Sequence, residues 1–383
     1  MTARARVAIV TTYYRPVLGG AESAAERLAS FLHRRGHAVT VLTKLTDAGH
    51  PAREVIDDVP VERLPPVGPR TASGKWRFAP TVFKALRARR RDFDIVCCVD
   101  YRGIGLAAIA ARATTGTPVI CYAQTEGILS GSFARRIAAV LYRRTNALAC
   151  ISRAIEREGL AAGLSRDHVF YVPNPVDTTR FSPASAEERR RLRASLGVGE
   201  SDVVAVFVGR LSREKGPVEL ATAWATIEPK ATVVFIGPPM TGHDWDVSGN
   251  VARIARESRI TPSFKLVGGL PPADVASWLR ASDFAVQPSH FEAMGLAAAE
   301  ELAAGLPVIA SDTGGYRDFI VPNENGLLVP PKDIRALGEA INRLVGDAAL
   351  RARMAVHARA SALAFEESKV MGDFSAIVDR LTA

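Results

Sequence analysis

The sequence predicts an α/β protein made of two doubly wound domains, each with a parallel sheet covered by helices on both faces. Short apolar runs alternate with helical segments along almost the whole chain. These runs lack the polar–apolar alternation of half-exposed strands, so they indicate strands buried on both faces. The pattern starts afresh near residue 200, and 383 residues are enough for two separate cores.

The first half begins with an apolar strand, Arg6–Thr11, and a loop that ends in Gly19 and Gly20. An amphipathic helix is expected from about residue 21 to residue 35, and Gly36 ends it. Further strands are predicted at Ala38–Thr43, Ile95–Val99, Val119–Tyr122 and Ala147–Ile151.

The second half repeats this order, with strands predicted at Val203–Val208, Thr232–Ile236, Lys265–Val267, Phe284–Gln287 and Val308–Ala310. The chain is predicted to cross from one domain to the other at residues 173–182, which are followed by the charged run Glu187–Arg193. We therefore expect one domain at residues 1–182 and another at 183–363, with the helical residues 364–383 packing back on the first. Ligands of doubly wound sheets bind outside the carboxyl ends of the strands, so functional residues are expected in the loops there.

The composition is that of an ordinary globular protein, with 48% hydrophobic and 23% charged residues. No apolar run approaches the ~20 residues of a membrane span, and the N-terminus lacks a signal-peptide pattern. The four cysteines lie in apolar runs without metal-ligand spacing, which predicts reduced, buried thiols and a cytoplasmic protein. They are Cys97, Cys98, Cys121 and Cys150.

The net charge of +9 is unevenly distributed along the chain. Residues 1–180 contain 27 Lys and Arg against 15 Asp and Glu, whereas the remainder contains 22 against 25. Two interpretations remain open: a solvated, arginine-rich surface, or a first half that meets an anionic membrane or acceptor.

The segment from Pro288 to Leu306 is the most informative part of the sequence. A polar loop carries Glu292, Gly295 opens a helix, and Glu300 follows within that helix. A helix start presents unpaired N–H groups that suit phosphate, and glycine allows close approach. Two carboxylates beside such a site fit hydrogen bonds to sugar hydroxyls, so the segment indicates a sugar-nucleotide site.

A second polar loop, Gly209–Gly216, follows directly on the predicted strand Val203–Val208. Arg210 leaves the strand end, and Lys215 lies near the start of the next helix. Both cations can bind one anion, the first through a planar fork and the second as a point charge. A solvated basic turn is the alternative for this loop considered alone.

Taken together, these motifs resemble those of the family 4 glycosyltransferases, retaining enzymes of the GT-B type with two Rossmann-like domains facing across a cleft. The resemblance covers nearly the whole chain, and its motifs occur in the family's order. It is carried by Gly19–Glu22, Val172–Asp177, Gly209–Gly216, Glu292 to Glu300 and Ala310–Gly315.

The resemblance implies a role for each matching residue in a hexosyl-type transferase of glycan or glycoconjugate biosynthesis. Arg210 and Lys215 would neutralise the donor diphosphate, and Glu292 would hold the donor sugar. Glu300 would bind the ribose, and the other donor-binding positions would be Gly19, Gly20, Gly209, Met294, Gly295 and Leu296. Fixed cations would replace a metal ion, so neither a cofactor nor a metal is expected.

The sequence departs from the family pattern near the reacting sugar. Many members have a histidine after the strand that corresponds to Val119–Tyr122, whereas this chain has Gln124, with Glu126 as the nearby carboxylate. A glutamine can donate to a sugar hydroxyl but cannot act as a base. We expect both residues at the catalytic centre. Tyr13, Tyr14 and Arg15 either contact an acceptor or pack within their loop.

Two Asp-x-Asp triplets, Asp92–Asp94 and Asp244–Asp246, test the expectation that no metal is bound. Such triplets chelate Mg²⁺ or Mn²⁺ in the other major glycosyltransferase architecture. The first triplet precedes a strand, which is the non-functional end in doubly wound domains. Metal binding is therefore not expected.

Two basic segments are candidates for contact with an anionic membrane. Residues 75–91 interleave Trp76 and Phe78 with cations that include Arg89, Arg90 and Arg91, and residues 133–144 predict a short basic amphipathic helix. The acceptor would be a lipid-linked or small-molecule hydroxyl compound. Nucleic acid is not expected as a partner, because no recognition motif accompanies the charge.

Other functions compatible with this architecture are a sugar-nucleotide epimerase, a phosphorylase, and an inactive nucleotide-binding membrane scaffold. The donor is expected to be a UDP- or GDP-sugar. A dehydrogenase is disfavoured, because the first loop lacks a G-x-G-x-x-G fingerprint.

Overall fold

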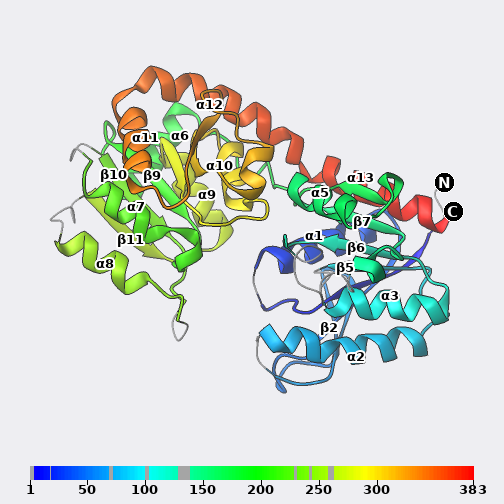
Figure 1. The fold of residues 1–383 in the computed structure, drawn as a ribbon. Coiled ribbons are helices and arrows are strands. Elements are labelled where there is room, and N and C mark those ends of the chain that lie inside the picture. Colours follow the sequence, from blue (N-terminus) through cyan, green and yellow to red (C-terminus); the bar gives the residue numbers. More distant parts are fainter. Residues whose placement is uncertain are drawn as a thin grey trace. The chain divides into compact units, whose positions relative to one another are not determined.

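The computed structural model describes residues 4–17, 19–68, 72–99, 103–127, 139–227, 231–240, 244–257 and 263–383. The chain forms two α/β units, one of Met1–Pro175 with Ser368–Ala383 and the other of Val176–Glu367 (Figure 1). Both are Rossmann-like, as the alternation of apolar runs and helices predicts.

The first unit contains an eight-stranded sheet in its described part, with the order β3-β4-β2-β1-β5-β6-β7-β8. All neighbouring strands are parallel except β3 and β4. The strands are β1 (Arg6–Thr11), β2 (Ala38–Lys44), β3 (Arg53–Ile56), β4 (Val59–Leu64), β5 (Ile95–Val99), β6 (Val119–Ala123), β7 (Ala147–Cys150) and β8 (Val169–Tyr171).

Helices cover this sheet, and the C-terminal helix returns to it, drawn in red in Figure 1. They are α1 (Gly20–Arg34), α2 (Ala72–Ala88), α3 (Gly103–Thr115), α5 (Arg153–Ala161) and α13 (Glu367–Thr382). The returning helix α13 buries Phe374, whose ring meets Tyr122 of β6 edge-on at 5.2 Å. The four cysteines of this unit are free and buried, and burial raises the pKa of each thiol.

The second unit contains a six-stranded parallel sheet in its described part, with the order β11-β10-β9-β12-β13-β14. The strands are β9 (Val203–Val208), β10 (Ala231–Ile236), β11 (Phe264–Gly268), β12 (Phe284–Gln287), β13 (Val308–Ser311) and β14 (Gly326–Val329). After β11 the chain crosses to the other side of β9, so the strand order reverses between β9 and β12. Ligands of doubly wound sheets bind at such a switch point.

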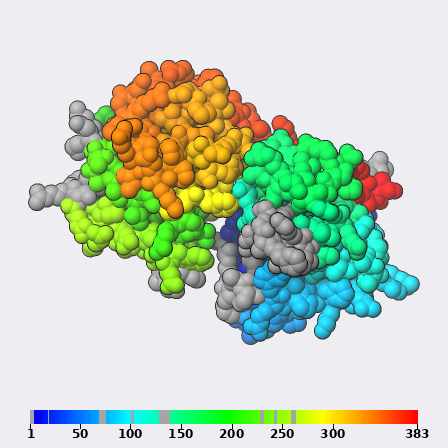
Figure 2. Space-filling model, viewed as in Figure 1, coloured from blue at the N-terminus to red at the C-terminus, as the bar shows by residue number. Residues whose placement is uncertain are grey.

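Seven α-helices and three short 3₁₀ turns accompany the described strands of the second unit. The helices are α6 (Ala186–Ser195), α7 (Pro217–Trp224), α8 (Ser248–Glu257), α9 (Pro272–Ala281), α10 (Leu296–Ala303), α11 (Ile334–Gly346) and α12 (Ala348–Ala362). The 3₁₀ turns are η2 (Arg213–Lys215), η4 (Gly314–Asp318) and η5 (Leu363–Phe365). Helices α10, α11 and α12 pack together and form the adjoining yellow and orange surface in Figure 2.

The units divide at different residues from those expected, because short contacts tie the crossover to the second unit. The amide of Val176 donates to the carbonyl of Phe365 at 2.7 Å, and Arg359 donates to the carbonyl of Phe181 at 2.9 Å. Residues 176–182 and 364–367 therefore belong to the second unit, whereas the sequence placed them with the first.

No helix in the described part of the chain is long and apolar enough to span a membrane.

Candidate functional site

The loops after β9 and β12 are held against each other at the switch point of the second sheet. Gly216 has φ +70°, and a Cβ there would lie 2.1 Å from the carbonyl oxygen of Pro288. The amide of His290 donates to the carbonyl of Glu214 at 2.8 Å. This packing brings the side chains of the loop after β9 close to those of the loop after β12.

Lys215 and Glu292 meet across this junction, with the ammonium Nζ of Lys215 in contact with carboxylate Oε2 of Glu292. Their side chains are 22% and 15% exposed, so the pair is partly shielded from water yet open to a ligand. A lysine ammonium has three donors, so Lys215 can keep Glu292 and still bind an anion. The structure therefore joins a predicted diphosphate residue to the predicted sugar residue.

Arg210 is placed in the same loop but is more exposed. Its guanidinium lies 3.2 Å from Glu214, whose carboxylate also accepts from the Ser212 hydroxyl at 2.8 Å. The preceding Gly209 donates its amide to the carbonyl of Ile236 at 2.9 Å, at the end of β10. Glu214 was not predicted, and it orients Arg210 at the carboxyl edge of the sheet.

The start of α10 packs directly on a buried tyrosine, Tyr316 of η4. Gly295 has φ +90°, and a Cβ there would lie 2.2 Å from the Tyr316 ring. The hydroxyls of Tyr316 and Ser289 lie 3.2 Å apart. Burial, and next the negative charge of Glu292, raise the pKa of Tyr316 well above its usual value, so the phenol stays neutral.

The backbone after β13 completes this support. The amide of Gly315 donates to the carbonyl of Glu292 at 3.0 Å, and a Cβ on Gly315 would lie 2.4 Å from Cα of Met294. The side chain of Met294 is buried, whereas Leu296 and Glu300 are partly exposed at the first turns of α10. The sequence located this glycine pair but missed Tyr316, which comes directly after it.

Replacing Gly295 with alanine should destabilise the second unit. The new methyl group would require φ +90° in an L-residue and would overlap Tyr316, an overpacking effect of about 1–3 kcal/mol. We expect the thermal midpoint to fall by about 2–4 °C for each kcal/mol. The matched control is Gly20→Ala in α1, where an added Cβ meets nothing within 4 Å. An unchanged midpoint in Gly295→Ala would contradict the packing described here.

A buried carboxylic acid lies behind the exposed Glu300. Glu301 is completely buried, and its Oε1 accepts from Gln287 at 2.6 Å, while Oε2 has no partner among the described residues. Burial raises the pKa of Glu301 well above its usual value, which favours the neutral acid. Gln287 also donates to the carbonyl of Val208, so this group links the ends of β9 and β12 with α10.

His290 is a positioning residue in this arrangement. Its Nε2 lies 2.7 Å from a carboxylate oxygen of Glu219 in α7. This contact connects the loop after β12 with helix α7.

In the first unit, Gln124 and Glu126 follow the carboxyl end of β6. Asn174 of the crossover donates to Gln124 Oε1 at 2.9 Å and accepts from the Tyr122 hydroxyl at 3.1 Å. Gln124 Nε2 is itself buried, and no residue in the described part of the chain accepts a hydrogen bond from it within 3.5 Å. Glu126 accepts from the Ser152 hydroxyl at 3.2 Å. Asn174 of the Val172–Asp177 motif thus orients Gln124.

The loop after β1 contains the three candidate acceptor residues, and it buries both tyrosines inside the unit. Tyr13 and Tyr14 are 2% and 3% exposed, and burial raises the pKa of Tyr14. Arg15 pairs with Glu26 and Asp57. Of the two interpretations left open by the sequence, this geometry favours loop packing. Gly19 and Gly20 lie at the start of α1, where the space around Gly20 is open.

No group of three or more His, Cys, Asp or Glu in the described part of the chain is arranged to hold a metal ion. Asp92 and Asp94 are paired with Arg89 and Arg6, respectively. Asp246 accepts from the amide of Ser248 at 3.0 Å.

The predicted basic segments are only partly described. Residues 128–138, which include the start of the proposed helix at 133–144, lie outside the described residues, as does the side chain of Lys75. Arg89 pairs with Glu62 and Asp92 and covers the Phe93 ring at 4.7 Å, so it has a structural role. Trp76, Arg90 and Arg91 are exposed, whereas Phe78 is buried.

Two family models match the chain over consecutive segments. The family described as Glycosyltransferase Family 4 matches residues 18–180, and Glycosyl transferases group 1 matches residues 188–361. The chain is 27% identical to a D-inositol 3-phosphate glycosyltransferase of Xylanimonas cellulosilytica, over 94% of this chain and 93% of that protein. It is 28% identical to a GDP-mannose-dependent alpha-mannosyltransferase of Mycobacterium tuberculosis, over 98% of both proteins.

Solved structures show the same fold. The sucrose-phosphate synthase of Thermosynechococcus elongatus superposes with a TM-score of 0.86 at 22% identity, covering 99% of both chains. Anabaena HepE, solved in complex with UDP and glucose, superposes with a TM-score of 0.79 at 21% identity, covering 98% of this chain and 99% of that one.

Proposed function

This chain belongs to the family 4 glycosyltransferases of the GT-B type, and on that premise we propose that it transfers a sugar from a UDP- or GDP-sugar to a hydroxyl acceptor with retention of anomeric configuration. The observation that carries the proposal is the contact between Lys215 and Glu292 beside the glycine-opened start of α10. The second unit binds the donor, and the first unit binds the acceptor.

Each residue of the donor site has a distinct task. Lys215 and Arg210 bind the diphosphate and stabilise the charge that grows on it as the glycosidic bond breaks. Glu292 accepts hydrogen bonds from the donor sugar, and Glu300 accepts them from the ribose. The amides near Met294, Gly295 and Leu296 donate to phosphate oxygens.

Retention follows from attack on the same face of the sugar. The bond between the anomeric carbon and the diphosphate oxygen breaks, and a bond to the acceptor oxygen forms. The acceptor proton passes to the departing diphosphate, so no protein base is required. Gln124, which directly follows β6, donates a hydrogen bond to a sugar hydroxyl. Proton NMR of the fresh product reads the anomeric configuration, and an inverted product would exclude this scheme.

A panel of nucleoside diphosphates and nucleotide sugars should identify the donor in thermal unfolding with and without EDTA. A ligand at about 100 times its Kd stabilises the fold by roughly 2.7 kcal/mol. We expect stabilisation by derivatives of one base and no effect of EDTA, because Lys215 and Arg210 supply the positive charge. Stabilisation that disappears with EDTA would contradict metal-independent binding. No response to any member would remove the support for a nucleotide-sugar site in this chain.

A peripheral membrane contact through α2 and the turn that follows it is proposed for an enzyme with a lipid-linked acceptor. Glutamate substitutions at the exposed Arg90 and Arg91 should weaken sedimentation with anionic vesicles, since each cation near such a surface contributes about 1 kcal/mol. Charge reversal at the exposed Arg335 and Arg353 of the second unit is the matched control. Equal sedimentation of both variants and the unmodified protein would leave a small-molecule acceptor as the better proposal.

A further inference from the structure

A cavity of about 280 Å³ lies in the second unit, away from the donor residues. Ser282 and Asp283, immediately before β12, line it, as do Gly305 and Leu306 before β13. The cavity therefore lies at the amino ends of these strands, whereas the donor candidates follow the carboxyl ends of β9 and β12. Its volume is near the lower limit, about 300 Å³, of pockets that hold small organic ligands.

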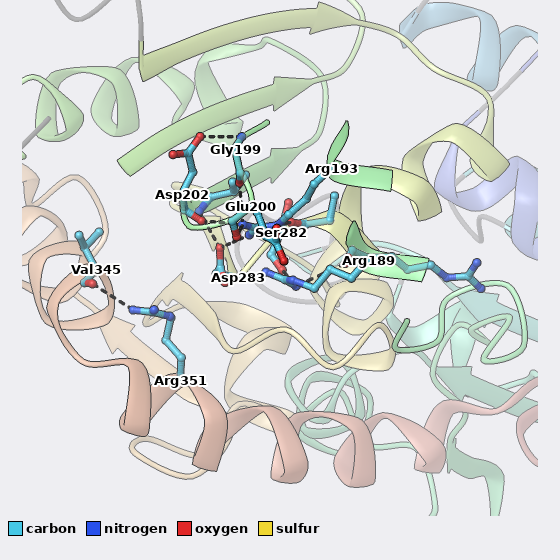
Figure 3. Close-up of polar contacts among 12 residues, drawn as sticks. Arg189, Arg193, Gly199, Glu200, Asp202, Ser282, Asp283, Val345 and Arg351 are labelled. Atoms are coloured by element: carbon cyan, nitrogen blue, oxygen red, sulfur yellow. Dashed lines mark hydrogen bonds and ion pairs between the residues drawn. The ribbon is translucent and has the colours of Figure 1, made fainter. Parts of the chain in front are cut away.

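Arginines dominate the polar lining of this cavity. Arg189 of α6, Arg280 of α9 and Arg351 of α12 contribute to the wall, and Asp283 is the one carboxylate among the described lining residues. Asp283 is already shared, because its oxygens accept from Arg189 and Arg193 at 2.7 Å each (Figure 3). Asp283 also accepts from the amide of Val204 at 2.8 Å, so its acceptor capacity is largely used.

The remaining arginines have few acidic partners. Arg280 lies 3.1 Å from Glu188 and also donates to the carbonyls of Arg180 and Ser182, at 3.1 Å each. Arg351 donates to the carbonyls of Leu344 and Val345 and has no carboxylate partner in the described part of the chain. The cavity wall and the residues directly bonded to it thus contain four guanidinium groups and two carboxylates. The cations are Arg189, Arg193, Arg280 and Arg351, and the anions are Glu188 and Asp283. Burial lowers the pKa of the Arg189 guanidinium, whereas the negative charge of Asp283 raises it. The positive charges of Arg193 and Arg351 lower it further. The cluster therefore has a surplus of positive charge that an anion would neutralise.

We propose that this cavity binds a small phosphorylated metabolite, with its phosphate held by Arg189, Arg280 and Arg351. A phosphate monoester carries a charge of about −1.5 to −2 at neutral pH, which matches the excess positive charge of the arginine cluster. A single carboxylate would neutralise only part of that charge. Guanidinium forks suit phosphate oxygens. The uncharged part of the metabolite contacts the apolar wall, formed by Pro183, Ala184, Leu279, Ala304, Leu306, Ala348, Ala352 and Ala355.

This site is separate from the donor site but is connected to it by one helix. Helix α10 begins beside Gly295, and the chain just after it, Ala304 and Gly305, lines the cavity. Eight helical residues span about 12 Å. A bound metabolite therefore contacts the far end of the element that presents Glu300.

Calorimetric titration of the full chain with inorganic phosphate and with glucose 6-phosphate, at constant ionic strength, tests the proposal. We expect saturable binding that becomes about ten- to hundredfold weaker in Arg351→Met and Arg280→Met, as for the loss of a charged hydrogen bond. Arg353→Met, an exposed change on the same helix, should bind like the unmodified protein. Lys215→Ala should also bind normally, because it alters only the donor site.

Three results would overturn the proposal: no saturable binding, undiminished binding in both Arg351→Met and Arg280→Met, or binding lost in Lys215→Ala. A second experiment, chemical modification of arginine, uses the unmutated protein and therefore does not depend on whether the arginine variants fold. Phosphate should protect Arg280 and Arg351 from phenylglyoxal, read by peptide mass spectrometry, while Arg353 reacts equally with and without phosphate. Equal modification of all three residues under both conditions would contradict the site.

Discussion

Lys215→Ala should lower turnover by about 10²–10³-fold, the effect typical of removing one donor that stabilises transition-state charge. It should also weaken nucleoside diphosphate binding by about ten- to hundredfold. Both effects have one cause, since the ammonium binds the diphosphate before the bond breaks and stabilises it more strongly afterwards. Steady-state kinetics and calorimetry with the nucleoside diphosphate measure the two effects separately.

The control for this variant is Arg213→Ala. Arg213 lies in the same 3₁₀ turn, but its side chain is exposed. It should retain normal turnover and affinity, because no diphosphate role is assigned to Arg213 and the Lys215–Glu292 contact stays intact. Normal activity in Lys215→Ala would remove the basis for placing the donor diphosphate at this junction.

Glu292→Gln should lower turnover by about a hundredfold while leaving the affinity for the nucleoside diphosphate alone unchanged or higher. The carboxylate is assigned to the sugar, which the free nucleotide lacks. Its contact with Lys215 adds a second effect, because a neutral glutamine releases the ammonium for the diphosphate. Comparison of the turnover number with the dissociation constant of the nucleotide distinguishes these effects.

Glu300→Gln serves as a comparison, because we expect the opposite pattern of effects on nucleotide binding and turnover. It is assigned to the ribose, so it should weaken nucleotide binding more than it slows turnover at saturating donor. A double-mutant cycle of Lys215→Ala with Glu292→Gln should show non-additivity, because the two side chains are in contact. Strictly additive effects, or weaker nucleotide binding in Glu292→Gln, would contradict the proposed division of tasks.

The fold was largely predictable because buried parallel strands leave a local signal. Runs such as Ile95–Val99 and Val203–Val208 are apolar throughout, and each forms a strand at those residues. The antiparallel pair β3 and β4 was missed, because both strands contain charged residues and β4 includes Pro60. The two strands form a hairpin through Asp57 and Asp58, both with positive φ, and β4 alone joins the sheet beside β2.

The candidate site was predictable where glycines mark a close approach of the backbone. Gly216 and Gly295 both have positive φ and adjoin another chain segment. The sequence suggested such backbone freedom at Gly295 alone. Tyr316 and Glu214 carried no such signal, because their importance depends on which side chains the fold brings beside them. Glu301 was overlooked beside Glu300, although one helical step of about 100° turns it to the buried side of the helix.

The return of α13 to the first unit has a consequence for how the protein is made. Residues 1–175 leave the ribosome long before Met371 and Phe374, which are buried in that unit. At about 5–20 residues per second, synthesis of Val176–Glu367 takes about 10–40 s. During that interval the face that α13 will cover, including Tyr122, is exposed on the nascent chain. The first unit thus begins to form first and completes its core last, after the second unit has been synthesised.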